Sequence, residues 1–70
     1  MECTVEITSA ALLPALIDAF RRNGCEADRA APTRCRVIHN ADSTQEARAE
    51  IAFFLRAWQL RHPDVEATIC

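Results

Sequence analysis

Four cysteines and two histidines are the side chains of this sequence with the most distinctive chemistry. They are Cys3, Cys25, Cys35, Cys70, His39 and His62. No two cysteines form a C-x-x-C motif, and no cysteine stands at a metal-motif spacing from either histidine. Thiolate and imidazole groups are good ligands for zinc and copper. Any metal site therefore has to be assembled by the fold, because local spacing does not provide one.

A second polar cluster is His39-Asn40 with Asp42, which precedes a predicted helix. A His and an Asp near a helix N-terminus can bind an anion or act as acid and base. Such residues more often serve as loop and capping residues, and His62 is explained in the same way by a helix C-terminus. No nucleophile, base and orienting group can be identified as a set. We therefore expect a protein that is not an enzyme.

Alternation of polar and apolar residues predicts strands with one buried face. The predicted strands cover residues 2–7, 25–29, 33–39 and 65–70. The inward side chains of the first and third strands are Cys3, Val5, Ile7, Cys35, Val37 and His39. A turn at 30–32 makes the second and third strands an antiparallel hairpin.

Two segments have the apolar spacing of a helix. The first helix is capped by Thr8 or Ser9, begins near Leu12 or Leu13 and ends before Gly24. The second covers residues 44–61, after a loop at 39–42 and a capping box of Ser43 with Glu46. The two buried stripes are Leu13, Leu16, Ile17 and Phe20, then Ala47, Ile51, Phe54, Leu55 and Trp58.

The order of these elements predicts an α+β fold, the ferredoxin-like βαββαβ sandwich. Each helix between two strands requires a crossover, and crossovers are right-handed in nearly all cases. Two such units joined by a hairpin give a four-stranded antiparallel sheet in the order 4-1-3-2, with two helices on one face. The alternative is another small α+β order with an edge strand displaced. Residues 1–70 are expected to form a single domain.

Several functions that use this arrangement need motifs that the sequence lacks. RNA-recognition domains stack bases on aromatic residues of the open face, which has none here. Heavy-metal carriers need a C-x-x-C after the first strand, and acylphosphatases need a Gly-rich anion loop there; this chain has Thr-Ser-Ala-Ala at 8–11. ACT regulatory domains usually carry a glycine at that turn, whereas the single glycine is Gly24. ACT-like ligand binding is the alternative that these absences exclude least.

The predicted topology brings Cys3, Cys25 and His39 to one end of the sheet, on its inward face. These three residues are the candidate metal ligands, and a small metal- or thiol-based binding protein is the alternative function that they indicate. Cysteine is also a common small core residue, which is the competing interpretation. Beyond this site, no cofactor is expected.

The outer side of the helix at 44–61 is a candidate interface. At about 100° per residue, Phe53 and Leu60 project opposite the buried stripe. The candidate interface residues are Ala49, Phe53, Arg56 and Leu60. Apolar side chains there favour a homodimer or a protein partner, and the two edge strands offer a second route to pairing. The expected function is a small non-enzymatic interaction or regulatory module that self-associates.

Composition limits the remaining classes. The net charge is −2, and no basic run is present, so nucleic acid is not an expected partner. No apolar run approaches the roughly 20 residues that cross a bilayer, so no membrane partner is expected. The N-terminus lacks the features of a signal peptide. We therefore expect a cytoplasmic protein with reduced thiols.

Overall fold

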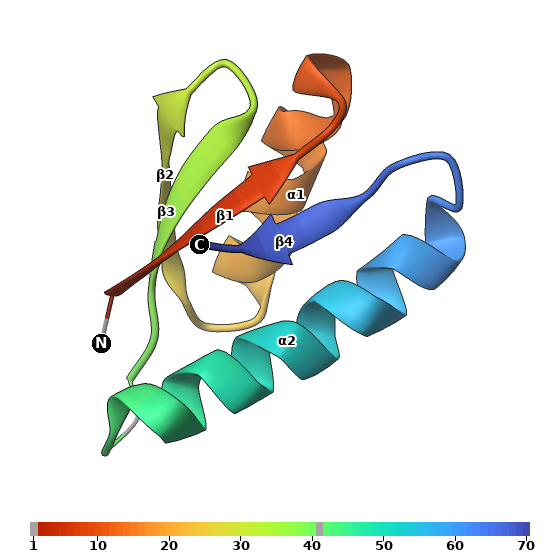
Figure 1. Ribbon diagram of the computed structural model, residues 1–70. Helices are drawn as coiled ribbons and strands as arrows, with labels where there is room; N and C mark the ends of the chain where they lie inside the picture. The colour runs from red at the N-terminus through yellow and green to blue at the C-terminus, as the bar shows by residue number, and fades with distance from the viewer. Residues whose placement is uncertain (1, 41) are drawn as a thin grey trace.

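The computed structural model describes residues 2–40 and 42–70 (Figure 1). Its elements are β1 (Glu2–Ile7), a 3₁₀ turn (Ala10–Leu12), α1 (Leu13–Arg22), β2 (Glu26–Ala31), β3 (Arg34–Ile38), α2 (Thr44–Arg61) and β4 (Ala67–Ile69). The strands form one antiparallel sheet in the order β2-β3-β1-β4. This is the predicted order 4-1-3-2 read from the opposite edge, so the α+β class and the strand order are confirmed.

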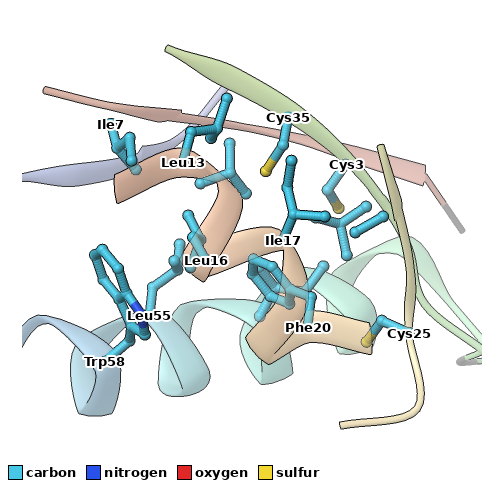
Figure 2. Packing of buried hydrophobic residues seen from close by; sticks show 14 of the residues in the cluster. Cys3, Ile7, Leu13, Leu16, Ile17, Phe20, Cys25, Cys35, Leu55 and Trp58 are labelled. Atoms are coloured by element: carbon cyan, nitrogen blue, oxygen red, sulfur yellow. The ribbon is translucent and has the colours of Figure 1, made fainter. Parts of the chain in front are cut away.

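One face of the sheet carries the core. Val5 and Ile7 of β1 and Cys35 and Val37 of β3 are all almost completely buried. They belong to one cluster that also contains Leu13, Leu16, Ile17 and Phe20 of the first helix and Ile51, Leu55 and Trp58 of the second (Figure 2). Alternation therefore predicted the inward side chains of β1 and of β3 at Cys35 and Val37 correctly, whereas His39, predicted as a further inward residue of that strand, lies beyond the end of β3 and is partly exposed.

The opposite face of the sheet is open and charged. Arg34 Nε contacts Glu6 Oε1 at 2.8 Å, and Arg36 Nε lies 3.8 Å from Glu2 Oε2. Glu6 lies directly opposite Arg34 in the β1–β3 register, whereas Glu2 and Arg36 are diagonal neighbours across the two strands. Opposite charges on neighbouring strands favour this pairing, and exposure to solvent keeps their contribution small. Paired charges on this side leave the other side of the sheet for the helices.

The hairpin differs from its prediction. The strand expected at 25–29 runs from Glu26 to Ala31, and the turn lies at Pro32 and Thr33 instead of 30–32. The register shifts between Arg29 and Ala31, which is a bulge that leaves one extra residue in β2. The bulge lets the strand continue to the proline, whereas alternation alone indicated an earlier end.

The ends of the helices agree with prediction in most respects. α1 begins at Leu13, with Pro14 in its first turn, where proline is tolerated. Ser43 Oγ accepts a hydrogen bond from Glu46 N at 3.1 Å, as a capping box requires. The predicted side-chain cap at Ser9 is wrong, because Ser9 makes no such bond. Within the predicted loop at 39–42, Ala41 lies outside the described residues.

Strand β4 is shorter than the predicted 65–70. Val65 N donates to His62 O at 3.1 Å, and Val65 O accepts from Gln59 Nε2 at 3.1 Å. The backbone of Val65 is therefore held by the turn that follows α2 and not by β1. Pairing begins after this turn, with Ile7 opposite Ala67.

Candidate functional site

A groove of about 470 Å³ lies where the end of α1, the start of β2 and the first half of α2 meet. Two of the three candidate metal ligands and two of the four candidate interface residues line it. The residues that matter for its chemistry are Cys25, His39, Ala49, Glu50, Phe53 and Phe54. The fold therefore joins, in one surface, two sites that were predicted separately.

Local structure explains how the groove is held. Gly24 has φ +88°, a left-handed conformation that turns the chain directly from α1 into β2. Cys25 N donates to Phe20 O at 3.0 Å, which fixes the first residue after the turn. The rings of Phe20 and Phe54 lie 4.4 Å apart between their centroids and form the apolar floor between the two helices.

A His–Glu pair lies at the polar end of the groove. His39 Nε2 is 2.6 Å from Glu50 Oε2, and the Glu50 side chain is about half exposed. Glu50 is a site residue that the sequence did not reveal. Helical periodicity places it beside the buried stripe of α2, but its contact with His39 depends on how the loop brings β3 and α2 together.

The thiol of Cys25 is nearly buried in the wall of the groove. Burial raises the pKa of this thiol above its usual value of 9.0, and the charge of Glu50 raises that pKa further. The side chain is therefore protonated at neutral pH. Because the thiolate is the nucleophile and the metal ligand, this environment favours neither role for Cys25.

The third candidate ligand, Cys3, lies elsewhere. Its side chain is 4% exposed and points into the core near Ile17 and Cys35 (Figure 2). Across residues 2–40 and 42–70, no three His, Cys, Asp or Glu side chains are grouped so that they could hold a metal ion. The metal site of Cys3, Cys25 and His39 stays a prediction, without support from this geometry.

The outer face of α2 continues from the groove. Phe53 is 76% exposed and Leu60 is 80% exposed, and Ala49 and Arg56 beside them are also exposed. The four residues follow each other at steps of four, three and four, the spacing of a helix–helix seam. Ala49 and Phe53 belong to both features, so the groove and the outer face form one surface.

The second histidine closes the other end of α2. His62 Nδ1 donates to Trp58 O at 3.0 Å, and the two rings stack with centroids 4.1 Å apart. This is a contact with the last turn of the helix, as the capping interpretation of His62 expects. It also covers one face of the indole ring, which is the single Trp of the chain.

No protein-family model, curated protein or solved structure matches the chain at a significant level. In the part of the chain that the structure describes, neither helix combines the length and the apolar character needed to cross a bilayer.

Proposed function

We propose that this protein is a small non-enzymatic interaction module that self-associates through the outer face of α2. The observation that carries the proposal is the exposure of Phe53 and Leu60, at 76% and 80%, on one face of one helix. Large apolar side chains that are grouped next to a groove are typical of a binding surface. Because Phe53 and Leu60 lie seven positions apart, which is about two helical turns, they point to the same side of α2.

The charges along α2 favour a second copy in antiparallel orientation. Glu46 and Glu50 lie in its first half together with Arg48, and Arg56 and Arg61 lie in its second half, so the first half carries one net negative charge and the second half two positive charges. An antiparallel pair places the acidic half of one helix beside the basic half of the other. Such complementarity fixes orientation and disfavours the parallel arrangement. The groove beside Phe53 offers space for an apolar side chain of the second copy.

The edge strand β2 is a poorer route to self-association. It carries Glu26, Asp28 and Arg29. In a sheet that continues through a two-fold axis, Asp28 opposite Asp28 or Arg29 opposite Arg29 would bring like charges together. A third symmetric arrangement of the two strands places Glu26 opposite Asp28 of the second copy, which again brings two acidic side chains together. Charged edges of this kind oppose pairing.

The electrostatics of the groove support a non-enzymatic role. The Cys25 thiol is held protonated by burial and by Glu50, and His39 is engaged with the same carboxylate. We assign the fold to the ferredoxin-like sandwich, on the strand order and the helix layer, and treat 1–70 as a single cytoplasmic domain. The paired charges of the open face support a partner other than nucleic acid.

The strength of the proposed dimer can be bounded from exposure. Complete burial of a Leu or Phe side chain is worth about 1.5 to 3 kcal/mol. Scaled by the exposed fractions of Phe53 and Leu60, the four side chains of a symmetric dimer contribute about 5 to 9 kcal/mol before the cost of association. Association itself costs roughly 4 to 15 kcal/mol, so the groove beside Phe53 and the charge pairs along α2 have to supply the rest of the stability of the dimer.

Sedimentation velocity over a concentration series tests the proposal. The wild-type protein is expected to sediment as a dimer at high micromolar concentration. The double variant Phe53→Gln/Leu60→Gln is expected to be monomeric, with a Kd raised at least about 100-fold. Gln keeps helix propensity, so circular dichroism and unfolding should be unchanged. Ile38→Thr, which changes the exposed apolar residue of the open face, is the matched control and should remain dimeric.

A wild-type protein that stays monomeric at these concentrations contradicts the proposal. So does a double variant that still sediments as a dimer.

A further inference from the structure

The two edges of the sheet differ in how they are protected. β2 carries three charged side chains and a bulge, which are common devices against pairing. β4 consists of Ala67, Thr68 and Ile69, with no charged residue, proline or bulge. Its shortness, three residues, is the one such device that it has, and its unpaired backbone groups can still template a further strand.

The backbone of β4 presents a regular row of groups to the outside. Cys70 N donates to Thr4 O at 2.8 Å, and Thr8 N donates to Glu66 O at 3.0 Å. In an antiparallel ladder the bonded residues alternate, so positions 66, 68 and 70 face β1. The N–H and C=O groups of Ala67 and Ile69 therefore point away from the sheet, and four backbone groups are available to a partner strand.

A groove of about 310 Å³ lies beside this edge, between β4 and α2. Its apolar wall includes Ala52, Leu55 and the half-buried side chains of Ala67 and Ile69. A strand added to β4 would direct every second side chain into this groove, because side chains alternate between the two faces of a sheet.

The polar lining of the groove consists of Arg56, Gln59 and Thr68, so its charge is positive. Arg56 lines it, and Arg48 reaches the same side of α2, where its Nη1 donates to Cys70 O at 3.1 Å. No acidic side chain lines the groove, and across the described ranges 2–40 and 42–70 Arg56 has no carboxylate within ion-pair distance. The site therefore favours a segment that carries a carboxylate among apolar side chains.

We propose that β4 binds an extended acidic segment of a partner protein by strand addition. The backbone of the segment pairs with Ala67 and Ile69, its apolar side chains enter the groove beside Leu55, and its carboxylate contacts Arg56. The edge of β4 and its groove lie on a different side of α2 from the groove at Phe53, and Arg56 lies at the border between the two surfaces. The inference goes beyond the self-association proposed above, and the backbone pairing with Ala67 and Ile69 does not depend on it.

Charge decides between a partner segment and a second copy of this chain. Two β4 strands can pair through a two-fold axis at Thr68, with Ala67 opposite Ile69 of the second copy, so the backbone alone allows a dimer. That arrangement brings Arg48 and Arg56 of both copies together on the helix side. Four arginines without an acidic residue between them oppose the pairing, whereas an acidic segment neutralises them.

The test uses a blocked hexapeptide, Val-Thr-Val-Thr-Asp-Thr, and its analogue with Lys in place of Asp. Titration into ¹⁵N-labelled protein should shift the amide signals of Ala67 and Ile69 and slow their hydrogen exchange. The Asp peptide is expected to bind at least about tenfold more tightly than the Lys peptide. Arg56→Glu should reverse this preference. Arg29→Glu, an equal change of charge at the opposite edge, should leave it unaltered.

A second variant tests the backbone pairing. Ala67→Pro removes an outward N–H and none of the bonds to β1, so the protein should fold and lose peptide binding. The absence of peptide-induced shifts in β4 overturns the proposal, as does equal binding of both peptides or unchanged binding by Ala67→Pro. If protection of Ala67 and Ile69 instead rises with protein concentration in the absence of peptide, the occupant is a second copy and the proposal is wrong.

Discussion

The thiol of Cys35 lies at the centre of the sheet, on β3, with its side chain fully buried. Burial raises its pKa from the usual 9.0 to about 11. The sequence has no Lys and no Tyr, so no lysine or tyrosine side chain titrates in the alkaline range together with Cys35. The loss of stability of this protein at alkaline pH is therefore a selective measure of how burial affects the Cys35 thiol.

The sign and size of the effect follow from linkage. Because the folded-state pKa is higher than the unfolded one, the unfolded chain releases the proton first as the pH rises. The stabilisation gained by keeping this thiol protonated is nearly complete below pH 9 and is lost as the pH rises through the folded-state pKa of about 11. One pKa unit corresponds to about 1.4 kcal/mol, so the full loss in the free energy of unfolding is about 3 kcal/mol, of which about 2 kcal/mol falls between pH 9 and 11.

Urea unfolding at several pH values from 7 to 11, in reducing buffer, measures this loss. The fluorescence of Trp58, which is 7% exposed, reports the transition. We expect Cys35→Ala to be less stable than wild type at pH 7, because a buried side chain is shortened, but to lose much less stability between pH 9 and 11. Val37→Ala, at the neighbouring inward position of the same strand, should be destabilised with the wild-type pH dependence.

Parallel curves for wild type and Cys35→Ala between pH 9 and 11 would refute the reasoning. They would mean that the thiol takes or releases its proton equally easily in the folded and unfolded states. The burial of β3 would then not have the electrostatic consequence described.

Two predictions concern local structure. Gly24→Ala should lower the free energy of unfolding by about 1 kcal/mol, measured by urea unfolding. A Cβ at φ +88° is strained even though no atom lies within 4 Å of it. Gly24→Asn should lose less stability, and equal losses for the two variants would contradict this explanation. Ser43→Ala should lower the free energy of unfolding by about 1 kcal/mol, because it removes the hydrogen bond that Glu46 N donates to the Ser43 hydroxyl. Ser9→Ala removes no cap bond and should leave stability nearly unchanged. A larger loss of stability for Ser9→Ala than for Ser43→Ala would contradict the assignment of the caps.

The sequence predicted the elements well where the signal is local. The buried positions of β1 and β3 follow a period of two, and the stripe of α2 from Ala47 to Trp58 follows the helical period. The bounds 44–61 of α2 agree with the predicted range, and its start follows from the capping box of Ser43 with Glu46. The ends of β2 and β4 were missed, because a bulge and a turn bond depend on the partner strand and on Gln59.

The candidate sites were predicted in part. Helical geometry alone indicated that Phe53 and Leu60 would be exposed, and the structure confirms their exposure. The meeting of Cys25 with His39 follows from topology, but the separation of Cys3 from them and the contact of His39 with Glu50 do not. Contacts of the second kind depend on how closely two elements pack, which no spacing along the chain encodes.

By itself, the amino-acid sequence determined which side of each strand and helix is apolar, and the order of elements then restricted the fold to a four-stranded antiparallel sheet with two helices. Hydrophobic periodicity is a local property, so these features can be read from neighbouring residues. Tertiary structure decided which surfaces adjoin one another. The groove beside Phe53 and the open, basic-flanked edge of β4 exist because α2 packs at one distance from α1 and from β4, and that distance is set by the shapes of side chains far apart in the chain.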